Sequence, residues 1–248
     1  MIKNYLNITL VFLSLFCMAR YAHAGWSIDL ESGLAVSGYN DVRIPGDTGT
    51  EFSLSEDLDA ENTAFIRARL NWDIGNRHTI SLLAAPLRIN SSGSLDRDIN
   101  YFGVQFPAGT NLDAKYRFDS YRITYRYTIF QSEKFKAGIG LTAKIRDASI
   151  KVEGGGESSE KSNTGFVPLI NFAVDWRFDS KLGLEFKGDA LAAPQGRAED
   201  ILLALYGIPA EKIRIRVGYR ILEGGADNDE VYNFALVNYL SAGITIAF

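Results

Sequence analysis

His78 is the side chain best suited to acid–base chemistry here, because the sequence has two histidines and the other, His23, lies close to the amino end. A histidine can activate a serine when the two side chains are within hydrogen-bond reach. Ser81 follows three residues later. Side chains alternate between the two faces of a strand, so His78 and Ser81 would point to opposite sides. The spacing therefore predicts no catalytic pair, and we expect no enzyme activity.

Two further segments have compositions that could bind ions. The acidic segment from Glu223 to Glu230 concentrates carboxylate and amide oxygens, which are the ligands that hard cations prefer. It lacks the spacing of an EF-hand loop, so we interpret it as a solvated loop, with a bound divalent cation as the open alternative. Gly154 to Gly156 are not followed by a helical pattern, which a phosphate-binding loop requires. We expect no resident metal and no cofactor.

The amino-terminal segment has the pattern of a secretory signal peptide. Lys3 precedes an apolar run from Ile8 to Met18, and an Ala-x-Ala pattern ends at Ala24, which predicts cleavage after residue 24. Cleavage would remove Cys17, which is the one cysteine of the chain, and with it any thiol chemistry. It would also remove Lys3 and Arg20 from a chain whose formal net charge is already -4, so we expect no nucleic-acid partner.

Residues 25–248 read as a single all-β domain, because no linker divides them and short and long connections alternate along the chain. The pattern predicts about ten strands, with eight or twelve as alternatives. The segment from Asp200 to Gly207 could also form two turns of amphipathic helix. The predicted strands cover residues 26–37, 63–74, 77–89, 115–130, 135–152, 164–178, 181–193, 200–207, 212–222 and 231–248. Long polar loops are expected at 38–62, 90–114, 153–163, 194–199 and 223–230.

The final strand alternates strictly between apolar and small or polar residues, and the chain ends on an aromatic. Its apolar face carries Leu240, Ile244, Ile246 and Phe248. Together with the export signal, this strand resembles the closing strand of small bacterial outer-membrane β-barrels, the superfamily that includes OmpW-like and OmpX-like proteins. The resemblance implies a transmembrane antiparallel up-and-down barrel with both termini in the periplasm. It also implies that the barrel-assembly machinery recognises the carboxy-terminal strand.

Aromatic residues close to the predicted short turns agree with this resemblance, since aromatic rings gather at both surfaces of a membrane. These residues are Trp72, Tyr127, Phe130, Phe135, Trp176, Phe178 and Phe248.

Charged residues decide which face of each strand points into the barrel. Between Lys212 and Leu222, isoleucine and other apolar residues alternate with Arg214, Arg216 and Arg220. An arginine facing lipid near the bilayer midplane costs about 2–4 kcal/mol, so the arginines must face inward. The same reasoning, applied to the other strands, predicts a charge network in the lumen. Its members are Arg67, Arg69, Asp73, Arg122, Arg126, Lys144, Arg146, Asp175, Glu185, Asp189, Arg214, Arg216 and Arg220.

The predicted lumen is narrow, because barrels of eight strands are just filled by side chains and open channels need about 16. Its charges could form a structural network of salt bridges, or they could line a narrow path that prefers anions. We therefore expect a noncatalytic, monomeric outer-membrane barrel that supports the envelope or passes very small solutes, with lipid and lipopolysaccharide as its surroundings. An enzyme acting on lipid A or peptides and a surface adhesin are the alternative functions.

Overall fold

The computed structural model describes residues 24–194 and 196–248, and the predicted signal peptide, with Cys17, lies outside this range apart from Ala24. The described residues form strands and no helix. The strands are β1 (Ala24–Arg43), β2 (Phe52–Ser53), β3 (Asp59–Ala60), β4 (Thr63–Ile74), β5 (His78–Ala85), β6 (Arg88–Ser94), β7 (Ile99–Tyr101), β8 (Val104–Phe106), β9 (Asn111–Gln131), β10 (Phe135–Gly154), β11 (Glu157–Arg177), β12 (Leu182–Ala193), β13 (Gly196–Ala210), β14 (Ile213–Asp227) and β15 (Tyr232–Ala247). No helix in this part of the chain is long and apolar enough to cross a membrane.

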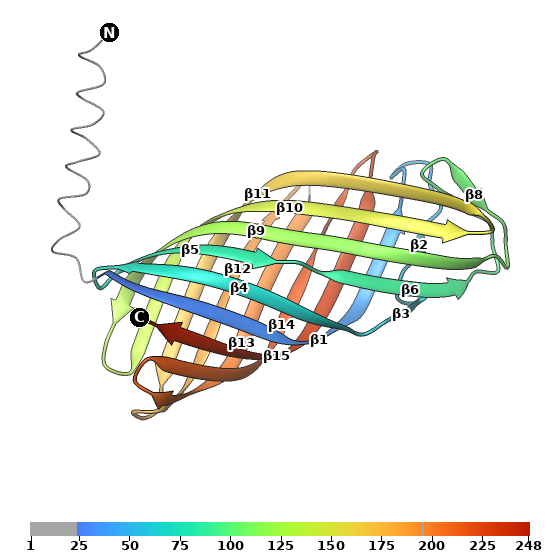
Figure 1. Ribbon diagram of the computed structural model, residues 1–248. Helices are drawn as coiled ribbons and strands as arrows, with labels where there is room; N and C mark the ends of the chain where they lie inside the picture. The colour runs from blue at the N-terminus through green and yellow to red at the C-terminus, as the bar shows by residue number, and fades with distance from the viewer. Residues whose placement is uncertain (1–23, 195) are drawn as a thin grey trace, which may run out of the picture.

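Antiparallel neighbours close the sheet into a barrel (Figure 1). Over the described residues, ten strands make the wall, with β5 and β6 counted as one strand because both pair with β9. The barrel closes where β1 pairs with β15 on one side and with β4 on the other. The prediction of ten strands is therefore confirmed, and β13 shows that the segment from Asp200 is a strand and not a helix.

The two ends of the barrel differ, as the alternation of connections predicted. Four short turns lie at one end of the barrel, together with the start of β1 and the end of β15 (Figure 1). We call this end the turn end. The opposite end, the loop end, carries β2, β3 and the hairpin β7–β8 between longer connections. The break between β5 and β6 falls at Pro86, which lacks the N–H group that a central ladder position needs.

Several predicted strand and loop limits at the loop end were wrong, because the strands run farther than the sequence pattern indicated. The polar segment 153–163 is not a long loop, since β10 and β11 continue to a two-residue turn. Gly155 and Gly156 form that turn with φ angles of 59° and 88°. Two successive positive φ angles are typical of tight hairpin turns, and glycine adopts them without steric cost. The predicted loops at 194–199 and 223–230 are also shorter, because β13 begins at Gly196 and β14 extends to Asp227.

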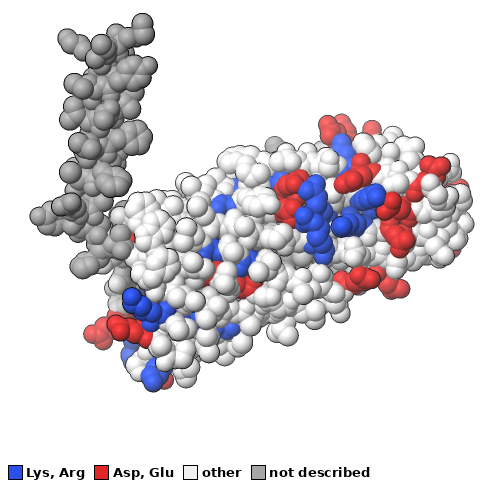
Figure 2. All heavy atoms as spheres, viewed as in Figure 1, with Lys and Arg blue, Asp and Glu red and all other residues white. Residues whose placement is uncertain are grey.

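Inward and outward side chains alternate along the wall as predicted. On β14, Ile215, Val217 and Tyr219 are exposed on the outside, whereas Arg216 and Arg220 are buried inside. On the face shown in Figure 2, a band with few charged atoms lies between charges at the turn end and a larger group toward the loop end. Outward ion pairs such as Arg88 with Asp119 and Arg117 with Asp147 lie at the loop-end limit of this band.

Aromatic side chains lie at the turn end of the band. Trp26 and Trp72 stack with their ring centroids 5.4 Å apart, and Trp176 meets Phe178 edge to face at 5.0 Å. The backbone of Phe248 exchanges hydrogen bonds with that of Trp26 across the seam. Leu240, Ile246 and Phe248 are exposed on the outside and Ile244 is half-buried, so the last strand has the predicted apolar face.

The interior at the loop end is apolar, which the expectation of a charged lumen did not anticipate. Residues from the connections, including Phe52, Leu54, Leu58 and Phe106, pack on Leu112, Tyr116, Ile150 and Val152 from the inner faces of β9 and β10. Tyr101 donates a hydrogen bond to the carbonyl of Ile150 at 2.8 Å and meets the ring of Phe52 edge to face. The connections β1–β4 and β6–β9 therefore fold inward and fill part of this end of the barrel, because their apolar side chains gain burial there.

Candidate functional site

Asp200 on β13 lies at the centre of a buried ion-pair network that crosses the lumen. Its carboxylate lies 2.8 Å from the guanidinium of Arg67 on β4 and 2.6 Å from that of Arg122 on β9. Arg220 on β14 is its third guanidinium partner. The Asp200 side chain is 2% exposed, so the three cations replace the water that the carboxylate loses on burial.

A second group of carboxylates, on β1, continues the network. Arg216 donates hydrogen bonds to both carboxylate oxygens of Asp29, at 2.9 and 2.6 Å, and one to Glu31 at 2.9 Å. Arg220 donates two more to Glu31, both at 2.8 Å. Because Arg220 contacts both Glu31 and Asp200, the two groups form one continuous network. The contact between Arg216 and Asp29 is bidentate, and bidentate pairs are among the strongest that arginine makes with carboxylates.

Asp189 on β12 connects the network to the opposite wall. It accepts hydrogen bonds from Arg122 at 2.7 Å, from the hydroxyl of Thr142 at 2.6 Å and from the amide of Asn171 at 2.8 Å. Strands β1, β4, β9, β10, β11, β12, β13 and β14 thus all contribute side chains to one hydrogen-bonded layer. This layer, which we call the waist network, is centred on Asp200, Glu31, Asp29 and Asp189.

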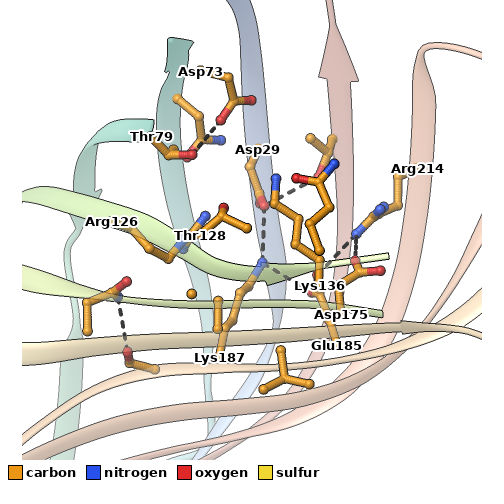
Figure 3. Close-up of a pocket in the computed structure, with 18 of the residues that line it drawn as sticks. Asp29, Asp73, Thr79, Arg126, Thr128, Lys136, Asp175, Glu185, Lys187 and Arg214 are labelled. Carbon is orange, nitrogen blue, oxygen red and sulfur yellow. Dashed lines mark hydrogen bonds and ion pairs between the residues drawn. The ribbon is translucent and has the colours of Figure 1, made fainter. Parts of the chain in front are cut away.

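A polar cavity of about 580 Å³ lies between the waist network and the turn end. Figure 3 shows Asp29 from β1, Asp175 from β11, Glu185 and Lys187 from β12 and Arg214 from β14 converging on it. Lys187 lies 3.1 Å from Glu185 and 3.5 Å from Asp29, and Arg214 lies 2.6 Å from Asp175. The guanidinium of Arg214 also stacks over the ring of Tyr206, 3.9 Å from its centroid.

The structure places the predicted lumen residues in three groups. Arg67, Arg122, Asp189, Arg216 and Arg220 belong to the waist network. The cavity at the turn end is lined by Arg69, Asp73, Arg126, Asp175, Glu185 and Arg214.

Lys144 and Arg146 lie on the other side of the waist network, toward the loop end. Neither has a carboxylate within salt-bridge distance in the part of the chain that the structure describes.

The sequence-based list missed three central carboxylates, Asp29, Glu31 and Asp200. Asp29 and Glu31 alternate with the exposed residues Ile28 and Leu30 on β1, so the rule used for the arginines would have placed both inside. Asp200 belongs to the segment that could also be read as a helix. With these carboxylates included, the lumen is closer to charge balance, which weakens the argument for an anion-preferring path.

The residues considered for catalysis remain apart. His78 is exposed on the outside at the turn end, with its Nδ1 2.8 Å from the hydroxyl of Tyr125. Ser81 is buried inside and donates a hydrogen bond to Asn71 at 2.8 Å, so the two side chains do lie on opposite faces.

In the acidic segment, Glu223 is bound by Arg197 and by the hydroxyl of Tyr39. Within residues 24–194 and 196–248, no group of three His, Cys, Asp or Glu side chains is arranged to hold a metal ion.

The fold is similar to that of the outer-membrane protease OmpT from Escherichia coli, with a TM-score of 0.58 and 11% sequence identity. This similarity covers 90% of the present chain and 97% of OmpT. Ail, the attachment invasion locus protein of Yersinia pestis, matches with a TM-score of 0.41 and 12% identity, over 90% of this chain and 99% of Ail. OprG from Pseudomonas aeruginosa matches with a TM-score of 0.36 and 9% identity, over 90% of this chain and 95% of OprG.

No family model matches the sequence, and no curated protein matches it. The chain therefore has the fold of a bacterial outer-membrane β-barrel, with no closely similar characterised member.

Proposed function

We propose that this protein is a noncatalytic barrel of the bacterial outer membrane that supports the envelope and is closed to solutes along its axis. In this proposal the signal peptide is cleaved near Ala24, and the barrel-assembly machinery recognises the strand that ends at Phe248. The mature chain is a monomer whose outer band contacts lipid and lipopolysaccharide. The fold and the apolar outward band support this setting.

The observation that carries the proposal is the waist network. Its side chains reach across the lumen from eight strands, and those of Asp200, Arg122 and Arg216 are at most 2% exposed. A solute on the axis would have to separate ion pairs that are buried on all sides, and leaving one of them unpaired costs about 3–5 kcal/mol. The apolar packing at the loop end adds a second obstruction.

Catalysis is not part of the proposal, although OmpT, which has a similar fold, is a protease. At 11% identity the similarity extends to the fold alone. His78 lies outside the lumen at the turn end and contacts a tyrosine rather than a carboxylate or a serine. A general base needs its nucleophile within hydrogen-bond reach, and the described residues offer His78 no such partner.

Planar-bilayer recording of the refolded chain, residues 25–248, tests the closed lumen against a narrow pore. We expect no stepwise conductance in concentrated potassium chloride, whereas a large porin inserted in the same bilayers conducts. Stepwise currents from the wild-type chain would overturn the proposal. If, in addition, Arg216→Glu changed their ion selectivity, the current would pass through the waist network and the narrow-pore function would replace the structural one.

A further inference from the structure

The barrel wall has a gap between β11 and β12 toward the loop end. These strands pair from Arg177 with Gly183 up to Ile170 with Ala190, and the pairing ends there. Beyond that point β11 continues from residue 169 to 157, paired with β10 alone, and β12 continues to Ala193, paired with β13 alone. A strand edge without a partner leaves backbone N–H and C=O groups unpaired, so the gap interrupts the hydrogen-bonded ladder of the wall.

A cavity of about 860 Å³ lies behind the gap. Phe166 and Pro168 from β11 and Leu191 and Ala193 from β12 line it, so both borders of the gap contribute. Its deeper walls include further apolar side chains of the barrel interior, namely Tyr116, Phe118, Leu222 and Val237. The cavity shares no lining residue with the cavity at the turn end, because the waist network separates them.

The gap borders the loop-end limit of the apolar outward band. Phe166 points outward and is 64% exposed, and its partner across the ladder, Ile145, is exposed beside Tyr121. Arg197 and Glu223, which form an ion pair, lie beyond the band. A molecule dissolved in the lipid could therefore reach the cavity sideways, without passing the packed residues that close the loop end.

Two cations in this cavity lack a counter-ion. Lys144 is 2% exposed and lies 4.7 Å from the centroid of the Phe118 ring. In the part of the chain that the structure describes, no carboxylate lies within 4.0 Å of Lys144, and no hydrogen bond from its ammonium group is found. Arg146 lies two residues along the same inward face and donates a hydrogen bond to the side chain of Asn163. The buried Nε of Arg146 has no hydrogen-bond partner.

Three carboxylates line the same cavity; Asp229 is exposed at the surface, and the other two are already engaged. Glu223 accepts hydrogen bonds from Arg197 at 2.9 and 3.0 Å, and Glu230 lies 3.4 Å from Lys161 near the opening. A buried cation without a partner is costly. An anion bound here would supply the partner that Lys144 and Arg146 lack, beside an extensive apolar wall.

We propose that this cavity binds a long-chain carboxylate, such as a fatty acid, that enters from the membrane through the gap between β11 and β12. The carboxylate pairs with Lys144 and Arg146, and the acyl chain lies along the apolar wall toward Phe166 and Leu191. The volume is within the range of about 300–1,000 Å³ that is typical of small-molecule sites. The proposal does not depend on the closed lumen, because the cavity lies to one side of the waist network.

Binding of radiolabelled palmitate to the refolded protein in phosphatidylcholine nanodiscs tests the proposal. We expect saturable binding that excess unlabelled palmitate displaces. Hexadecanol, which lacks the charge, and acetate, which lacks the chain, should not displace it. The variant Lys144→Met keeps the length of the side chain and removes the charge, and we expect it to bind palmitate at least about tenfold more weakly. Lys212→Met, at the turn end, is the matched control and should bind as the wild type does.

Circular dichroism and heat-dependent gel mobility show whether Lys144→Met is folded, and Arg146→Gln provides a second charge-removing variant. Absence of saturable binding by the wild type would overturn the proposal, as would equal affinity in Lys144→Met, Arg146→Gln and Lys212→Met. The route is tested with Ala193→Trp, which adds bulk at the border of the gap. We expect slower palmitate uptake by this variant, and an unchanged rate would exclude entry through the gap.

Discussion

At the scale of single residues, the stability of the barrel interior depends on carboxylates that each pair with more than one arginine. Asp200 contacts Arg67, Arg122 and Arg220, and Glu31 contacts Arg216 and Arg220. Removing Asp200 leaves Arg67 without a carboxylate partner and takes one of two partners from Arg122 and Arg220, in a place that water hardly reaches. The waist network should therefore be sensitive to the loss of an acid.

Asp200→Asn keeps the size of the side chain and removes its charge. We expect the variant to lose about 3–5 kcal/mol of unfolding free energy, because three buried guanidinium groups lose a shared partner. Urea unfolding in lipid vesicles, followed by tryptophan fluorescence, measures the change. Glu199→Gln, one position earlier on β13, is the control and should stay within about 0.5 kcal/mol of the wild type. Similar stabilities for the two variants would contradict the role given to Asp200.

Acid sensitivity should arise in part from the outward pair of Arg88 and Asp119. The hydrogen bonds from Arg88 hold the pKa of the Asp119 carboxyl below its usual value of 3.8. A carboxyl whose pKa is lower in the folded state stabilises the fold above its unfolded pKa, and this stabilisation is lost as the pH falls through the folded pKa. Asp119→Asn should therefore lower the melting temperature at pH 7, and the difference from the wild type should shrink below about pH 4. A constant difference at both pH values would contradict this assignment.

At the scale of strands, the alternation of apolar and polar side chains determines which face of each strand points into the lumen and in which register the strands pair. The pattern of Arg214, Arg216 and Arg220 against isoleucine and valine predicted the inward face of β14 from the sequence alone. The same rule would have found Asp29 and Glu31 had it been applied to β1. Sequence patterning predicted β10 to within two residues but did not reveal how far β11 extends, because polar residues beyond the membrane band carry no alternation of apolar and polar side chains.

Val217→Arg tests the lipid-facing side of β14, where the wild-type side chain is 63% exposed on the outside. We expect a loss of about 2–4 kcal/mol in lipid vesicles, because the new cation would face the hydrocarbon. The same measurement on Asp229→Arg, at an exposed position in the loop after β14, should show little change. If Val217→Arg were equally well tolerated, the outward face of β14 would not contact lipid.

At the scale of the whole molecule, the barrel is divided into a polar cavity, a waist of ion pairs and an apolar loop end. The strand count and the charged waist follow from alternation, which is a local property of the sequence, whereas closure into a barrel was expected from the resemblance of the last strand to outer-membrane barrels. The inward packing of residues such as Phe52 and Leu58 does not, because it depends on contacts between connections that are distant in sequence. The gap between β11 and β12 could not be predicted from the sequence either, since no local pattern shows where two strands stop pairing.

A barrel that crosses the membrane in this way must place its tryptophans in lipid near the turn end. All three tryptophans of the chain, Trp26, Trp72 and Trp176, lie there, and Trp26 and Trp176 are exposed on the outside. Such rings sit among the headgroups at the membrane surface. The wild-type protein therefore carries its own probes of depth, and no substitution is needed.

The most direct test is fluorescence quenching of the refolded protein in vesicles of brominated phosphatidylcholine. We predict strong tryptophan quenching by lipids brominated close to the headgroup and weaker quenching by lipids brominated near the chain ends. Absence of quenching by either lipid, with the protein remaining folded in buffer without lipid or detergent, would contradict the membrane-spanning barrel.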